Sequence, residues 1–85
     1  MKYYLLSLKH TKKSDKHMTF WRPNDRGYTY CLNVAGIYID IEEGYHSSEN
    51  TKPISVEEIE KIQIHDSLEG YVVENNKKNR EILGI

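Results

Sequence analysis

Cysteine and long apolar runs are the two features that this sequence most clearly lacks. Its only cysteine is Cys31, so no disulfide can form within the chain, and a reducing compartment is expected. The apolar stretch in MKYYLLSLKH, at residues 1–10, is too short for a signal peptide or a membrane-spanning helix. The sequence therefore predicts a cytoplasmic protein that does not contact a membrane.

Residue types that commonly carry out catalysis are present but are not grouped. No two histidines are three or four residues apart, the spacing that places two metal ligands on one helix face; they are His10, His17, His46 and His65. No glycine-rich loop of the kind that binds phosphate occurs. Cys31 falls in an aromatic strand, where we expect a buried and unreactive thiol. We therefore expect no metal, no cofactor and no catalytic residues, and the chain favours binding over catalysis.

The length of 85 residues suits one small domain spanning residues 1–85. Only one Phe and one Trp are available to fill a core, and seven tyrosines supplement them. We expect Phe20 and Trp21 to be buried, while Tyr28 and Tyr30 are equally suited to the core and to the surface.

The charge is divided along the chain, although the net charge is only −1. Residues 1–38 contain seven basic and two acidic residues, whereas residues 39–85 contain five basic and eleven acidic residues. Two arrangements remain open. The halves interleave in the fold and partly neutralise each other, or they form one basic and one acidic face.

Alternating side chains predict several β-strands. Residues 3–9 are largely apolar on both faces at their start, as in a central strand, and the polar, basic residues 10–17 would form an exposed connection. A second strand over residues 18–22 ends at Pro23, which cannot donate a ladder hydrogen bond, and a third is predicted over residues 27–32.

The clearest alternation in the chain is IYIDI at residues 37–41, which predicts a further strand. A connector at residues 33–36 would precede this strand, and residues 43–52 have the composition of a surface loop. Residues 70–74 are predicted to form another strand.

The strongest local signal predicts a helix over about residues 55–63. Ser55 and Glu58 form a capping box, and Ile54 and Ile59 occupy the positions of a hydrophobic staple. A short C-terminal helix is expected over residues 76–83. Together these patterns predict an α+β fold, a small antiparallel sheet of four to five strands with the main helix packed on one face.

Two surfaces are candidates for binding. The N-terminal half combines basic and aromatic residues, as proteins that bind single-stranded nucleic acid do. The second half offers carboxylates that would attract a basic partner and a tyrosine that would anchor it. The nucleic-acid set is Lys12, Lys13, Arg22, Arg26, Tyr28 and Tyr30, and the protein-binding set is Glu42, Glu43, Tyr45, Glu57 and Glu60.

Three stretches of the first 40 residues, SLKHT at 7–11, TFWRPNDRGYTY at 19–30 and AGIY at 35–38, carry a resemblance to known proteins. They resemble a pattern of small proteins encoded by phages and prophages, in which SLKHT is followed by FWxPNxxGYT and AGxY. The resemblance implies a mobile-element origin, with the host cell cytoplasm as the place of action, and it implies no particular reaction.

These observations lead to one main hypothesis and one alternative. The main hypothesis is a non-enzymatic binding protein that occludes the surface of a host protein, as a counter-defence or host-modulating inhibitor. The alternative is a nucleic-acid or nucleotide-binding protein that uses the basic, aromatic half. The sequence fixes no oligomeric state, although an exposed edge strand would allow a dimer.

Overall fold

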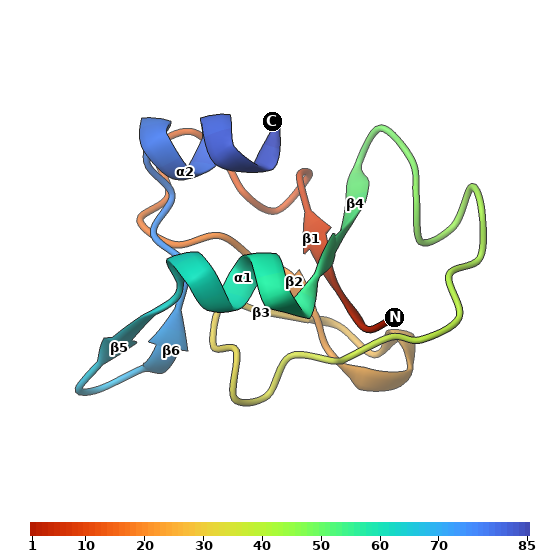
Figure 1. The fold of residues 1–85 in the computed structure, drawn as a ribbon, viewed down its shortest axis with the longest axis horizontal. Helices are drawn as coiled ribbons and strands as arrows, with labels where there is room; N and C mark the ends of the chain where they lie inside the picture. The colour runs from red at the N-terminus through yellow and green to blue at the C-terminus, as the bar shows by residue number, and fades with distance from the viewer.

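The first strand of the chain lies inside the sheet. The structure, a computed structural model, describes residues 1–85, and β1 (Tyr3–Ser7) is hydrogen-bonded to a strand on each side (Figure 1). Its Leu5 and Leu6, which point to opposite faces, are both fully buried. The predicted central strand is therefore confirmed, and its two apolar faces are both covered.

The sheet has four antiparallel strands in the order β3-β2-β1-β4. Its longest pairing joins β1 to β4 (Thr51–Ser55), with Tyr3 opposite Ser55 and Ser7 opposite Thr51. β4 was not predicted as a strand, since its residues read as the end of a loop and the start of a helix. It tolerates Pro53 because it is an edge strand, where a missing N–H leaves no neighbour unpaired.

The other two strands form a very short hairpin. β2 (Phe20–Trp21) and β3 (Tyr28–Thr29) are shorter than the predicted strands over residues 18–22 and 27–32. A single 3-10 turn, η1 (Pro23–Asp25), joins them. The hairpin thus places Trp21 at its end, directly before the turn.

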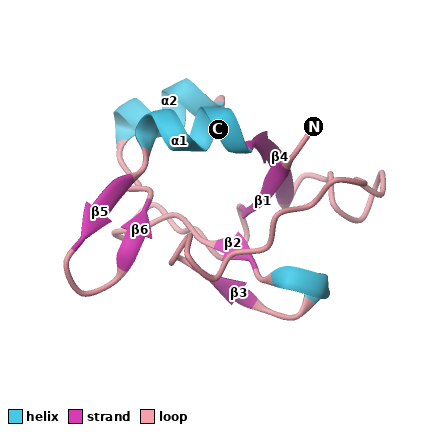
Figure 2. Ribbon diagram, turned by 60° about the horizontal axis from the view of Figure 1, so that its bottom comes forward, coloured by secondary structure: helices cyan, strands magenta, loops and turns pink.

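Both predicted helices are present. α1 (Val56–Ile62) begins after Ser55, whose Oγ accepts a hydrogen bond from the Glu58 N–H at 3.2 Å. α2 (Lys77–Leu83) begins after an asparagine cap and ends at Gly84, which has φ of +71°. Figure 2 shows the two helices together at one side of the molecule, with β2 and β3 at the opposite side. The α+β fold is therefore confirmed.

Two further strands form a hairpin of their own. β5 (Ile64–Asp66) follows α1 directly and pairs only with β6 (Gly70–Val72), so this hairpin projects from the main body (Figures 1 and 2). Of the strand predicted over residues 70–74, the first three residues are confirmed, whereas β5 was not predicted. Val73 then returns the chain to the core, where it is fully buried.

The strand predicted over residues 37–41 is wrong. Only Tyr38 makes a β-bridge, to Tyr3, and the exposed fractions of Ile37 and Ile39 are 51% and 65%. The alternation is real, but the tyrosine faces inward instead of the isoleucines. The reason lies in the tertiary contacts of the tyrosine ring, which are described below.

The core connects the sheet to both helices. Its apolar members come from β1, β2, β4, both helices and the segments between these elements; they are Tyr4, Leu6, Met18, Phe20, Leu32, Ile54, Ile59, Val73 and Leu83. Cys31 is not among them. Contrary to the prediction it follows β3 instead of lying within a strand, and it is only half-buried, with its Sγ 3.8 Å from the Asn33 Oδ1. No helix in the structure has the length and apolar content needed to cross a membrane.

Candidate functional site

Trp21 lies at the centre of an aromatic cluster. As predicted, it and Phe20 are buried, with exposed fractions of 7% and 0%. The indole meets Tyr38, Tyr45 and His46 edge-on, with ring centroids 6.4, 5.3 and 5.5 Å away. Its Nε1–H is buried without a hydrogen-bond acceptor, so these ring contacts must offset the cost of that unpaired donor.

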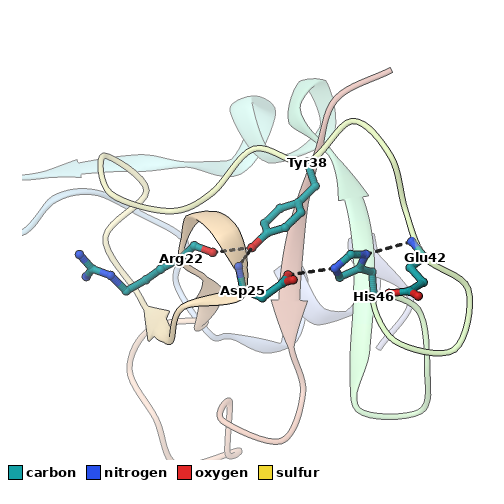
Figure 3. Close-up of polar contacts among 5 residues, drawn as sticks. All are labelled: Arg22, Asp25, Tyr38, Glu42 and His46. Atoms are coloured by element: carbon teal, nitrogen blue, oxygen red, sulfur yellow. Dashed lines mark hydrogen bonds and ion pairs between the residues drawn. The ribbon is translucent and has the colours of Figure 1, made fainter.

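His46 ties the loop over residues 42–46 to the β2–β3 hairpin. Its Nδ1 accepts a hydrogen bond from the Glu42 N–H at 2.9 Å, so the ring proton is on Nε2. That Nε2–H donates to the Asp25 Oδ1 at 3.0 Å (Figure 3). The Glu42 carbonyl in turn accepts from the His46 N–H at 2.8 Å. The loop is therefore closed on itself and fixed to the hairpin.

The turn that carries Asp25 has an unusual backbone. Asn24 and Asp25 both have φ of 58°, a left-handed conformation that Asn and Asp tolerate better than other non-glycine residues. The Tyr38 hydroxyl holds this turn, because it accepts from the Asp25 N–H at 2.9 Å and donates to the Arg22 carbonyl at 2.5 Å (Figure 3). Burial raises the pKa of Tyr38, although the hydrogen bond from the Asp25 backbone acts in the opposite direction.

These contacts explain why Tyr38 faces inward. Its hydroxyl bridges the backbone of Arg22 and Asp25. Gly36, which has no side chain, leaves room for the Tyr38 ring beside the Pro23 backbone. A Cβ at Gly36 would lie 2.8 Å from the Pro23 backbone and 2.8 Å from the Tyr38 ring. The sequence pattern alone contains no sign of these long-range contacts.

The network positions a loop and occupies both ring nitrogens of its histidine. A general base must reach the proton that it removes, with a nitrogen or oxygen that is free to accept it. Both ring nitrogens of His46 are occupied, one by the Glu42 N–H and one by Asp25. No group of three or more His, Cys, Asp or Glu side chains is arranged so that it could hold a metal ion.

The positioned loop displays three residues of the predicted protein-binding set. Tyr45 is 49% exposed even though one side of its ring contacts Trp21, and Glu42 and Glu43 are exposed beside it. The exposed Ile37 and Ile39 precede them in the same stretch of chain. We call residues 37–45 the apolar–acidic segment.

The structure separates the remaining two residues of that set. Tyr3 pairs with Tyr38 on one side and with Ser55 on the other, so β1 lies between the apolar–acidic segment and the first turn of α1, which carries Glu57. Glu60 instead lines a small pocket with Tyr4, whose pKa is raised by burial and by the charge of Glu60. Neither Glu57 nor Glu60 therefore belongs to the apolar–acidic segment.

The predicted nucleic-acid set is partly brought together. Tyr28 lies against His10, with ring centroids 4.0 Å apart, and Tyr30 stacks on His17 at 5.1 Å. Both tyrosines are partly exposed, with exposed fractions of 46% and 40%. The loop over residues 10–17, which carries the exposed Lys12 and Lys13, is thus held at both ends against the aromatic strand.

Acidic residues of the second half reach this basic surface. The Tyr30 hydroxyl donates to the Glu69 carboxylate at 3.0 Å, and this hydrogen bond raises the pKa of Tyr30. Asp66 has a pKa below its usual value, because it accepts from the Leu68 and Glu69 N–H groups and, to a smaller extent, because it is near Lys16 and His17. The two charge halves therefore interleave here.

The two arginines of the set lie elsewhere. Arg22 and Arg26 are exposed in the turn between β2 and β3, and the stem of Arg22 passes close to Gly27. Neither arginine forms an ion pair. They adjoin Tyr28, so half of the predicted set gathers at this turn.

The central residues of the network were not singled out from the sequence. His46 and Asp25 are far apart in the chain, and Tyr38 was assigned to a strand, so no local spacing indicated that they meet. The nearest signal was the combination of Pro23, Asn24 and Asp25, which predicts a turn but not what the turn contacts.

Comparison with known proteins adds no relative. No protein family model, no curated protein and no solved structure matches this chain.

Proposed function

We propose that the protein is a non-enzymatic binding protein that occludes the surface of a host protein with its apolar–acidic segment. Its origin in a phage or prophage is a proposal that rests on the sequence resemblance in residues 7–38. A role in counter-defence or in modulating the host follows from that origin. The host cytoplasm would be its place of action.

The observation that carries the proposal is the fixed loop over residues 42–46. His46 locks this loop to Asp25 and to Trp21, so Tyr45 is presented on a support that is ordered before binding. A loop that is already ordered loses less conformational entropy when it binds. An amphipathic aromatic side chain on a rigid support is typical of the residues that dominate binding energy in interfaces.

The surroundings of Tyr45 indicate the chemistry of the partner. Ile37 and Ile39 offer apolar area, and Glu42 and Glu43 offer negative charge without a cation paired to either carboxylate. A complementary surface would have an apolar centre and a basic rim, because such charges speed the encounter and select the partner. We therefore propose a partner with lysines or arginines around an apolar patch.

A comparative pull-down from a bacterial lysate tests this proposal. The bait is the wild-type protein, a Tyr45→Ala/Glu43→Lys variant, or a Glu81→Lys variant, whose charge is reversed on α2. We expect one host protein to be captured by the wild type and by Glu81→Lys but lost with the first variant. Far-UV circular dichroism checks that each bait is folded, because the Tyr45 ring contacts Trp21 and its removal would itself change the tryptophan fluorescence.

Two further results refine or overturn the proposal. Glu57→Lys and Glu60→Lys should each leave capture unchanged, because neither carboxylate belongs to the apolar–acidic segment. Capture that is equally strong with the folded Tyr45→Ala/Glu43→Lys bait would contradict the proposed surface.

The alternative, nucleic-acid or nucleotide binding, remains a second candidate on one observation. His10 and His17 hold the lysine-bearing loop against Tyr28 and Tyr30, which leaves two exposed rings beside cations. Its test is the binding of a short single-stranded oligonucleotide over a range of salt concentrations. Affinity that falls steeply with salt, and that is lost in Arg22→Ala or Arg26→Ala, would support it.

A further inference from the structure

A second cationic surface lies between the N-terminal loop and the C-terminal helix. A groove of about 580 Å³ separates the loop over residues 12–16 from α2, and its cationic lining residues are Lys13, Lys77 and Arg80. This volume is within the range of sites that hold small ligands. The groove includes none of the residues of the apolar–acidic segment.

Arg80 is held in place by a chain of neutral groups. Its Nη1 donates to the Asn75 Oδ1 at 2.8 Å. The amide nitrogen of Asn75 donates in turn to the carbonyl oxygens of Lys12 and Asp15, at 2.7 and 2.9 Å. Asn75 thereby joins the loop to α2 and fixes the guanidinium between them.

The charge of Arg80 is not neutralised. The structure contains two ion pairs, His46–Asp25 and Lys77–Glu81, and neither involves Arg80. A guanidinium has five N–H donors, so most of those of Arg80 remain available after the hydrogen bond to Asn75. This geometry suits an oxyanion, since a planar guanidinium can donate to two of its oxygens at once.

Lys13 and Lys77 add to the positive charge of Arg80 in the groove. Lys13 has no acidic partner, and Lys77 is 4.0 Å from Glu81 with both side chains exposed, a distance at which such a pair contributes little. Among the side chains that line the groove three are basic, Lys13, Lys77 and Arg80, and one, Glu81, is acidic. The two edges of the groove therefore carry an excess of positive charge.

We propose that this groove binds the phosphate group of a nucleotide, either free or within a single-stranded chain. Arg80 donates to the phosphate oxygens from its fixed position, and Lys13 and Lys77 close on the anion from the two sides. The site shares only Lys13 with the nucleic-acid surface suggested by the sequence. It does not depend on the partner surface proposed above.

Titrations of the ¹⁵N-labelled protein followed by NMR test the site at low salt. The probes are inorganic phosphate, adenosine 5′-monophosphate and a ten-nucleotide single strand of deoxyadenosine. We expect saturable shifts of the Asn75 side-chain amide and of the Arg80 guanidinium with the nucleotide probes. Tighter binding of the single strand would identify a nucleic-acid chain as the source of the phosphate, and tighter binding of the mononucleotide would identify a free nucleotide.

Variants separate this groove from the β2–β3 turn. Arg80→Gln should weaken binding by about tenfold or more, as expected for the loss of hydrogen bonds to a charged group. Lys13→Gln/Lys77→Gln should also weaken it, and this variant keeps the Asn75–Arg80 contact, so it remains informative if Arg80→Gln does not fold. Lys9→Gln, at an exposed lysine that does not line the groove, is the matched control and should bind like the wild type.

Two results would overturn the proposal. One is the absence of saturable shifts with all three probes at millimolar concentration. The other is binding that survives Lys13→Gln/Lys77→Gln but is lost in Arg26→Gln, since this would place the phosphate at the hairpin turn.

Discussion

The ammonium group of Lys52 donates a hydrogen bond to the carbonyl oxygen of Leu83 at 2.6 Å. This contact joins the edge strand β4 to the last turn of α2. The last carbonyl groups of a helix have no partner within the helix, and a cation beside them is favoured by the helix dipole. Lys52 therefore holds the C-terminal helix against the sheet.

Replacement of this lysine should loosen the helix. We expect Lys52→Met to lower the free energy of unfolding by about 1–2 kcal/mol, because a hydrogen bond from a charged group is lost while the apolar stem is kept. Urea denaturation measures the effect, and hydrogen exchange should show faster exchange in α2. Lys9→Met, at an exposed lysine outside the sheet, is the control and should change stability by less than about 0.5 kcal/mol.

The imidazole of His46 should be important for the order of the 42–46 loop. His46→Ala removes the hydrogen bonds to Asp25 and Glu42 and part of the ring cluster, so we expect a loss of about 1–3 kcal/mol. The fluorescence of Trp21 should change as well, since the imidazole lies 5.5 Å from the indole. His65→Ala, at an exposed histidine beside Tyr71, should leave both quantities nearly unchanged. Equal effects of the two substitutions would contradict the role assigned to His46.

Asp66 should make the β5–β6 hairpin sensitive to acid. The Leu68 and Glu69 N–H groups hold the pKa of this carboxyl below its ordinary value of 3.8 in the folded protein. The carboxylate therefore contributes stability above pH 3.8, and this contribution is lost as the pH falls through the folded pKa. Asp66→Asn should destabilise the hairpin at neutral pH but not in acid, as measured by amide exchange of residues 64–72. A difference between the two proteins that stays constant down to the lowest pH would contradict this assignment.

Gly36 should not tolerate a side chain. In Gly36→Ala the new methyl group would meet the Pro23 backbone, which cannot move without disturbing η1, and we expect a loss of about 1–3 kcal/mol. Gly44→Asn is the control: its side chain would enter open space, and asparagine tolerates the φ of +87° found there. Thermal unfolding of the two variants compares the cost of the steric clash in Gly36→Ala with the cost of placing a side chain at positive φ in Gly44→Asn. A stable Gly36→Ala variant would show that η1 can shift.

The sequence predicted those helices and strands that are determined by residues within the same short segment. The cap at Ser55 and the apolar stripe of α1 gave the main helix, and the apolar faces of residues 3–9 gave the central strand. The buried positions of Phe20 and Trp21 followed from the small number of large apolar side chains.

The elements that were missed depend on contacts between distant residues. β4 forms because β1 offers a free edge, and nothing within residues 51–55, which include a proline, indicates a strand. The IYIDI pattern predicted a strand that does not form, because Tyr38 faces inward and its hydroxyl binds a turn that precedes it in the chain. The same division applies to the candidate site. Tyr45 and the neighbouring carboxylates were named from the sequence, whereas the His46–Asp25 contact that fixes their loop joins distant residues and was not predicted.

The pairing of β1 with β4 also determines when the protein can fold during its synthesis. β1 acquires its longest partner only after residues 51–55 have emerged from the ribosome, and α1, which contributes to the core, follows them. Until then the nascent chain exposes the leucines of β1 and a free backbone edge, which other chains or chaperones can bind. Because loop closure over such a separation is slow compared with local turns, the sheet should form only after β4 has been synthesised. During this interval residues 1–50 are therefore open to chaperones and to proteases.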